Sequence, residues 1–143
     1  MKDDYFFIDT NVLVYAFDES EKAKREKAKK IVEKITKGEM KGAVSGQVLG
    51  ELFTVLLKKI EKPVEKEKAR IIVNGLIDSV HWKKINYSEK TISNAMDRAI
   101  NDKTPFWDSL IAETMIENKV PVILTENLKD FKSKELRAVN PFK

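Results

Sequence analysis

The chain has 143 residues, of which 42% are hydrophobic and 35% are charged, so its composition is that of a globular protein and excludes a disordered or collagen-like chain. It contains no cysteine and a single histidine, His81, which excludes disulfides, cysteine-ligated metal centres, a cysteine nucleophile and paired-histidine sites. Any chemistry is left to 23 Asp and Glu residues, and the net charge of +4 fits a polyanionic partner such as nucleic acid.

The length suits one domain, which we expect to span residues 1–143. No apolar run approaches the roughly 18 residues of a membrane span. The first five residues, Met-Lys-Asp-Asp-Tyr, lack the pattern of a secretory signal. We therefore expect an intracellular protein of the cytoplasm.

Short apolar runs alternate with segments in which apolar residues recur at helical spacing. In chain order, these patterns predict a strand at 5–8, helices at 12–17 and 21–37, a strand at 43–45, helices at 47–60 and 64–78, a strand at 81–85, a helix beginning after Ser88, a helix from 104 to 118, and strands at 122–124 and 137–139. For the helix at 104–118, Thr104 and Pro105 suit the N-cap and the first helical position. Strands that alternate with helices predict an α/β fold with a central parallel sheet of about four to five strands.

Polar residues follow two of the clearest predicted strands. Asp9-Thr10-Asn11 comes after the first strand, and Thr125-Glu126-Asn127 comes after the strand that ends at Leu124. Ligands of open parallel sheets bind outside the carboxyl ends of the strands, so the two triplets would face each other if these strands are neighbours. The simpler interpretation is that Asp9 only caps the helix that follows it.

Asp108 occupies an unusual position in its predicted helix. Its neighbours three, four and seven residues onward are Ile111, Ala112 and Met115, which places the carboxylate at the centre of an apolar stripe. Such a carboxylate faces the domain interior, where a charge is costly unless it is paired or bound to a metal. The alternative is an acid favoured by the helix dipole, which does not require the side chain to point inward.

Glu51 lies at the edge of the apolar surface of its helix, beside Gln47 and Thr54. Because glutamate is usually exposed, the spacing alone favours a solvated side chain there. A functional role for Glu51 depends on the other carboxylates.

Four blocks of sequence, taken together and in this order, resemble a known family. They are residues 7–13 (FIDTNVL), 45–52 (SGQVLGEL), 106–111 (FWDSLI) and 123–128 (ILTENL). The pattern resembles the PIN-domain ribonucleases, most closely the VapC toxins of toxin–antitoxin pairs, and it extends from Tyr5 to about Phe131. The resemblance implies a PIN-like α/β fold.

The resemblance also implies a set of site residues. Asp9, Glu51 and Asp108 match the acids that gather around a divalent metal in that family and carry catalysis. Asn127 stands where a fourth acid is usual, and an amide is a weaker ligand than a carboxylate, so Glu126 or Asp130 would be the substitute. Oxygen ligands without cysteine or histidine suit Mg²⁺ or Mn²⁺.

Three further polar residues, Thr10, Asn11 and Thr125, would orient the substrate or the ligands under this interpretation. Turn and cap chemistry explains them equally well. The family expectation for the whole chain is a metal-dependent endoribonuclease that hydrolyses RNA phosphodiester bonds, acts as a type II toxin with a VapB-like antitoxin as partner, and forms a homodimer.

Two other functions remain open at this point. One is a PIN nuclease of RNA processing that has no antitoxin. The other, motivated by Asn127, is a catalytically weak PIN-like module that binds RNA or protein.

Overall fold

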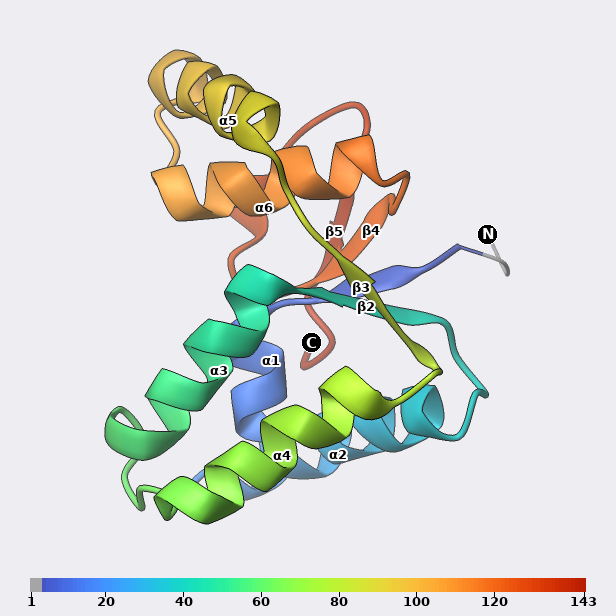
Figure 1. The fold of residues 1–143 in the computed structure, drawn as a ribbon, viewed down its shortest axis with the longest axis vertical. Helices are drawn as coiled ribbons and strands as arrows, with labels where there is room; N and C mark the ends of the chain where they lie inside the picture. Colours follow the sequence, from blue (N-terminus) through green and yellow to red (C-terminus); the bar gives the residue numbers. More distant parts are fainter. Residues whose placement is uncertain (1–3) are drawn as a thin grey trace.

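Five parallel strands form one sheet in the computed structural model, which describes residues 4–143. Residues 1–3 lie outside this range. The expected domain at 1–143 and the expectation about the first five residues both extend over them. The strands are β1 (Phe6–Ile8), β2 (Gly42–Ser45), β3 (Trp82–Ile85), β4 (Val122–Leu124) and β5 (Arg137–Val139). Their order is β3-β2-β1-β4-β5, so β1 is central and β4 is its neighbour (Figure 1). The predicted α/β fold with a parallel sheet is confirmed.

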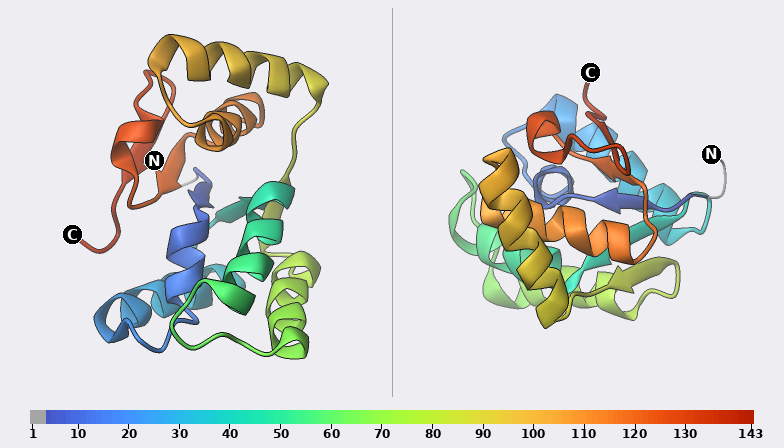
Figure 2. Two further views of the ribbon diagram at one scale, coloured as in Figure 1. Left: turned by 90° about the vertical axis from the view of Figure 1, so that its left-hand side faces the viewer. Right: turned by 90° about the horizontal axis from the view of Figure 1, so that it is seen from above.

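Helices fill each connection between the strands. They are α1 (Thr10–Tyr15), α2 (Lys22–Thr36), α3 (Gly46–Lys58), α4 (Lys66–Asp78), α5 (Glu89–Asp102) and α6 (Phe106–Glu117), with a 3₁₀ turn η1 (Leu128–Phe131) between β4 and β5. Helices α1 to α4 lie on one side of the sheet, and α5 and α6 lie on the other (Figures 1 and 2). No helix within residues 4–143 is long and apolar enough to cross a membrane.

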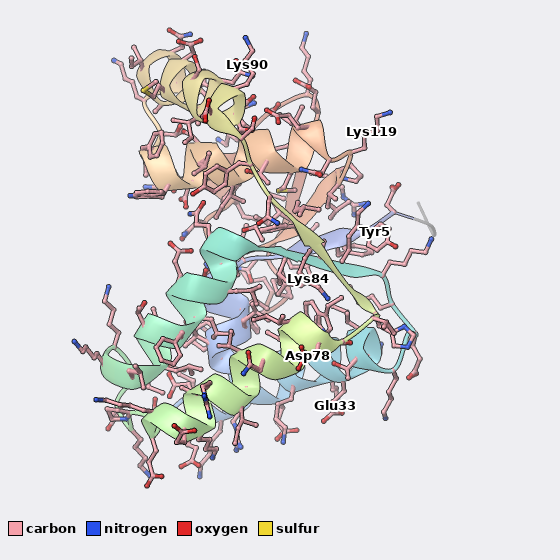
Figure 3. The ribbon with its side chains drawn as sticks, in the orientation of Figure 1. Tyr5, Glu33, Asp78, Lys84, Lys90 and Lys119 are labelled. Atoms are coloured by element: carbon pink, nitrogen blue, oxygen red, sulfur yellow. The ribbon has the colours of Figure 1, made fainter. Side chains whose placement is uncertain are left out.

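The core lies between the sheet and the helices on its two sides. Phe7, Ile8, Val44 and Ile123 on the central strands are completely buried, as expected for parallel strands covered on both faces. Helix α2 packs closely on β2 because Gly42 has no side chain; a Cβ there would lie 2.5 Å from the Cδ1 of Ile35. Charged side chains line the outer surfaces (Figure 3).

Helix α6 begins one residue later than the sequence indicates. Pro105, rather than Thr104, is the N-cap, since its carbonyl accepts the first helical hydrogen bond from the N–H of Ser109 at 2.9 Å. The hydroxyl of Thr104 instead lies 2.6 Å from the hydroxyl of Ser109. The predicted N-cap is therefore wrong by one residue, and the Thr104 hydroxyl bonds to the Ser109 side chain within the helix.

The carboxyl ends of β1, β2 and β4 share one edge of the sheet because the strands run parallel. Asp9 lies directly between β1 and α1, and its N–H donates to the carbonyl of Leu124 at 3.1 Å. At the end of β2, the hydroxyl of Ser45 caps α3 by accepting from the N–H of Val48 at 3.3 Å. Two helices thus begin at this edge, with polar residues at their first turns.

Candidate functional site

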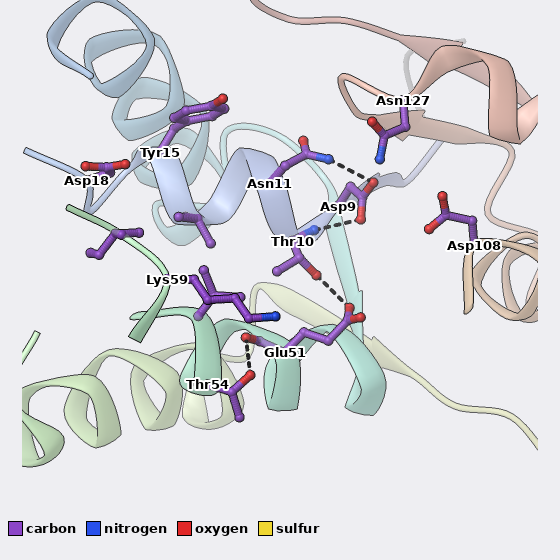
Figure 4. Close-up of a pocket in the computed structure, with 13 residues that line it drawn as sticks. Asp9, Thr10, Asn11, Tyr15, Asp18, Glu51, Thr54, Lys59, Asp108 and Asn127 are labelled. Carbon is purple, nitrogen blue, oxygen red and sulfur yellow. Dashed lines mark hydrogen bonds between the residues drawn. The ribbon is translucent and has the colours of Figure 1, made fainter. Parts of the chain in front are cut away.

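A pocket of about 450 Å³ opens at the carboxyl edge of the sheet. One end of it is lined by Asp9, Glu51, Asp108 and Asn127, which come from four separate segments of the chain (Figure 4). We call this the carboxylate end. The structure therefore brings together the three acids that the sequence singles out.

Asp9 is held firmly at the base of this end. Its side chain is 4% exposed and accepts hydrogen bonds from the N–H of Thr10 at 2.8 Å, the hydroxyl of Thr125 at 2.7 Å and the amide of Asn11 at 3.2 Å. Burial raises the pKa of Asp9 above its ordinary value, and these hydrogen bonds act against that rise. Asp9 caps α1 and lines the pocket at once, so the two interpretations of this residue are compatible.

The two polar triplets meet as the sequence predicts. The side-chain NH₂ of Asn11 also lies 3.5 Å from the hydroxyl of Thr125, and the side-chain oxygen of Asn11 accepts the backbone N–H of Glu126 at 3.3 Å. The N–H of Asn127 donates to the Thr125 hydroxyl at 3.0 Å. Thr125 is completely buried, so this network fixes the turn after β4 against the turn after β1.

Glu51 reaches the pocket from α3. Its side chain is half-buried and accepts a hydrogen bond from the hydroxyl of Thr10 at 2.8 Å. Helical spacing alone favours a solvated side chain, whereas the structure shows a half-buried one with a hydrogen-bond partner on α1. The spacing could not show this, because the partner that orients Glu51 lies on a different helix.

Asp108 lies at the margin of the core. It is half-buried and lines the pocket, whereas Ile111, Ala112 and Met115 on the same stripe are buried. The sequence predicts that the Asp108 carboxylate faces the interior of the domain. This is corrected: the carboxylate faces the pocket. The start of α6 is tied to α3 by the Gln47 side-chain amide, which donates to the carbonyl of Trp107 at 3.2 Å.

The partner of Asp108 is another acid, Asp130 on η1. The pKa of Asp108 is raised to about 7 by burial, by a hydrogen bond with Asp130 and by the charges of Asp9, Asp130 and Glu51. Below that pH the carboxyl group of Asp108 is mostly protonated and can donate this hydrogen bond to Asp130. Asp130 is therefore the additional acid that approaches the carboxylate end.

Glu126, the other possible substitute for a fourth acid, is engaged elsewhere. Its carboxylate accepts the Tyr15 hydroxyl at 2.9 Å and pairs with the ammonium of Lys24 at 2.8 Å. Asn127 is exposed and lines the pocket itself. Asn127 thus lines the pocket, Asp130 lies beside Asp108, and the side chain of Glu126 is directed towards α1 and α2.

The opposite end of the pocket is not marked by the sequence analysis. It is lined by Val14, Tyr15, Asp18, Lys59 and Ile60. Helical spacing is a signal that could have found part of it, because Tyr15 follows Asn11 by four residues on α1, and Thr54 follows Glu51 by three on α3. No such pattern marks Asp18 or Lys59, which lie in connections.

The donor set fits a hard divalent cation in type, since it consists of carboxylate, amide and hydroxyl oxygens. The charges of neighbouring acids contribute to the raised pKa of Asp108, so the pocket is a favourable place for a cation. Within residues 4–143, however, no three acidic or histidine side chains converge closely enough to enclose an ion. The acids line one pocket with space between them.

The family model for the PIN domain matches residues 6–135 of the sequence, so the chain belongs to the PIN-domain family. Solved structures of similar fold include VapBC2 of Rickettsia felis bound to a promoter DNA fragment, at 21% identity and a TM-score of 0.65, covering 95% of this chain and 98% of that one. VapC20 of Mycobacterium tuberculosis, a toxin that cleaves the sarcin–ricin loop, is 16% identical with a TM-score of 0.64, covering 82% and 86%. FitAcB of Neisseria gonorrhoeae is 15% identical with a TM-score of 0.66, covering 96% and 98%. Among curated proteins, none matches this chain in sequence.

Proposed function

We propose that the protein is a metal-dependent endoribonuclease that hydrolyses RNA phosphodiester bonds. One observation carries the proposal: Asp9, Glu51 and Asp108, from three separate segments of a PIN-domain chain, line one pocket at the carboxyl edge of the sheet. Carboxylates of this kind serve to hold Mg²⁺ or Mn²⁺ next to a phosphate. The similarity in fold to VapC20, a toxin that cleaves the sarcin–ricin loop, supports the same conclusion.

Each residue has a distinct part in this proposal. Asp9, Glu51 and Asp108 would hold the metal, with Asn127 as a neutral ligand and Asp130 as the nearest acid that could replace the missing charge. A bound divalent cation would neutralise phosphate charge and lower the pKa of a water that attacks phosphorus. Thr125 and Asn11 orient Asp9, and Thr10 orients Glu51, through the hydrogen bonds described above.

We further propose that the protein is the toxin of a toxin–antitoxin pair and acts in the cytoplasm as a homodimer. One solved structure of similar fold is a toxin–antitoxin complex from Klebsiella pneumoniae, 20% identical with a TM-score of 0.65. The pocket is lined by Asp9, Asp18, Glu51 and Asp108 but by a single cation, Lys59, although the chain carries a net charge of +4. Such a pocket is complementary to an Arg or Lys side chain of an inhibitory VapB-like antitoxin.

The proposal is tested with the purified protein and a mixture of cellular RNAs. Cleavage is expected after addition of Mn²⁺ or Mg²⁺ and is expected to stop with EDTA. Binding of RNA without cleavage at any metal concentration would favour the PIN-like binding module. Cleavage without growth arrest on expression, and without a small neighbouring gene whose product co-purifies, would favour a nuclease of RNA processing.

A further inference from the structure

Lys24 is the centre of a cluster that joins three distant parts of the chain. Its ammonium pairs with the carboxylate of Glu126 at 2.8 Å and lies 3.3 Å from the hydroxyl of Tyr15. It also lies over the rings of Tyr15 and Phe142, 4.8 Å and 5.9 Å from their centroids. The two rings contact each other edge to face at 5.2 Å. We call these four residues the Lys24 cluster.

The cluster is built more firmly than an ordinary surface ion pair. The side chain of Lys24 is 37% exposed and that of Glu126 is 25% exposed, so both charges are partly withdrawn from water. Glu126 has two partners, Lys24 and the hydroxyl of Tyr15, while Lys24 gains cation–π contacts with both rings. The hydrogen bond from Lys24 to Glu126 raises the pKa of the lysine, which therefore stays charged at physiological pH.

Glu126 connects the cluster directly to the carboxylate end. Its backbone N–H donates to the side-chain oxygen of Asn11 at 3.3 Å, and the side-chain NH₂ of Asn11 donates to Asp9 at 3.2 Å. On either side of Glu126 in the chain, Thr125 donates to Asp9 and Asn127 lines the pocket. Whatever holds the side chain of Glu126 thus also holds the backbone that presents Thr125 and Asn127.

We propose that Lys24 and Glu126 are positioning residues, whose ion pair, packed on Tyr15 and Phe142, holds residues 125–127 against Asp9 and thereby prepares the pocket for metal and RNA. The role of the pair in cleavage rests on the proposed nuclease function. In this account the pair acts through the turn after β4 and not by contact with metal or substrate, since the Lys24 ammonium bonds to Glu126 and Tyr15. In this account Glu126 is an anchor of the turn after β4 and has no part as a metal ligand.

The test compares Lys24→Met with Lys24→Arg in the full chain. The methionine variant is expected to lower kcat for RNA cleavage by roughly tenfold and to weaken Mn²⁺ binding, because partners that orient metal ligands act on both. The KM for RNA is expected to stay unchanged. Lys24→Arg keeps a cation over the rings and beside Glu126, so it is expected to retain nearly full activity. Amide hydrogen exchange at residues 125–127 should rise in the methionine variant alone.

Two further variants separate positioning from a simple loss of charge. Lys30→Met removes the same charge from an exposed position on the same helix and is expected to behave as the wild type. The double variant Lys24→Glu with Glu126→Lys restores an ion pair in reverse and is expected to recover part of the kcat lost by Lys24→Met. Failure of this reversal to recover any kcat would contradict a role of the pair.

Other outcomes also decide the matter. A kcat of Lys24→Met equal to that of the wild type would overturn the proposal. A KM for RNA that is raised in both Lys24→Met and Lys30→Met would also overturn it, because both lysines would then be contacts to RNA phosphates. A wild-type protein that cleaves no RNA would reject the nuclease function separately. Hydrogen exchange at residues 125–127 would then test the anchor by itself, and equal exchange in wild type and Lys24→Met would overturn it.

Discussion

The carboxylate end of the pocket has two sides that are built in opposite ways. On the strand side, Asp9 is 4% exposed and accepts hydrogen bonds from Thr10, Asn11 and Thr125. On the helix side, Asp108 is half-buried and its hydrogen-bonding partner is another acid, Asp130. The first side is satisfied by hydrogen-bond donors, whereas on the second side burial and neighbouring acids raise the pKa of Asp108 to about 7.

This difference shows which part of the site is complete before a ligand arrives. Three donors satisfy Asp9 and fix its position, so its carboxylate is organised in advance of metal binding. Asp108 and Asp130 repel each other when both are ionised, and an added cation would relieve that repulsion. The account therefore predicts that the two sides respond differently to substitution, to metal and to pH.

The largest expected effect is on RNA cleavage, which substitutions on either side of the carboxylate end should reduce to a similar extent. Asp108→Asn and Asp9→Asn are each expected to lower metal-dependent RNA cleavage by about 100-fold or more, because each removes a ligand charge. Asp97→Asn on α5, an exposed position, is the control and should cleave normally. Cleavage at the wild-type rate by Asp108→Asn would remove this residue from the site.

Substitutions on the two sides should have different effects on the stability of the metal-free protein. Asp9→Asn is expected to destabilise the metal-free protein by about 1–3 kcal/mol, since an amide cannot accept all three of the donors that surround Asp9. Asp108→Asn should leave the melting temperature unchanged or raise it at pH 8, because it removes a repelling charge. Thermal denaturation in EDTA measures both, and equal destabilisation by the two changes would contradict the comparison.

Substitution of Asp130 should change the cleavage rate more than substitution of the exposed Asn127. Asp130→Asn is expected to lower cleavage at limiting Mg²⁺ by roughly tenfold, because it removes the acid nearest to Asp108. Asn127→Asp should change the rate little if Asp130 already supplies the fourth charge. Rates measured against Mg²⁺ concentration decide this: a clear gain from Asn127→Asp at limiting metal would show instead that the site lacks a charge.

Metal should stabilise the folded chain by mass action. At a Mn²⁺ concentration 100 times the Kd, the expected gain is about 2.7 kcal/mol, which is seen as a higher melting temperature. Asp108→Asn should lose most of this gain, and Asp97→Asn should keep it. A melting temperature that does not respond to Mn²⁺ at neutral pH would favour a PIN-like binding module.

A further expected effect is a dependence of metal-free stability on pH. The pKa of Asp108 is raised from 3.8 to about 7 in the folded protein, so the folded state binds this proton more tightly than the unfolded state. Its contribution to stability is complete below about pH 4 and is lost as the pH rises to about 7. Asp108→Asn should remove this part of the slope in denaturant titrations at several pH values, and an unchanged slope would contradict the raised pKa of Asp108.

Much of this arrangement is readable from sequence because it depends on local patterns. Apolar strands followed by Asp9-Thr10-Asn11 and Thr125-Glu126-Asn127 predict that the triplets meet, and parallel pairing of β1 with β4 brings them together. The side chains of Glu126 and Asp130 could not be assigned in this way. The partners of Glu126 lie 102 and 111 residues away, at Lys24 and Tyr15, so its direction is set by tertiary contacts.

The same reason explains the other limits of the sequence analysis. Gln47 ties α3 to α6 through the carbonyl of Trp107, a contact that no spacing indicates. The orientation of Glu51 depends on Thr10, which lies 41 residues earlier. The far end of the pocket, with Asp18 and Lys59, combines residues from connections whose paths follow from packing of the helices.

The most direct test of the raised pKa of Asp108 and of its proposed role as a metal ligand is to count the protons released when Mn²⁺ binds. Calorimetric titrations at pH 6.5, in buffers with different ionisation enthalpies, should give release of roughly one proton per protein, because Mn²⁺ displaces the proton of Asp108. The Asp108→Asn variant should bind Mn²⁺ more weakly and release almost none. Binding of Mn²⁺ without proton release by the wild type, or with unchanged affinity in Asp108→Asn, would contradict the account.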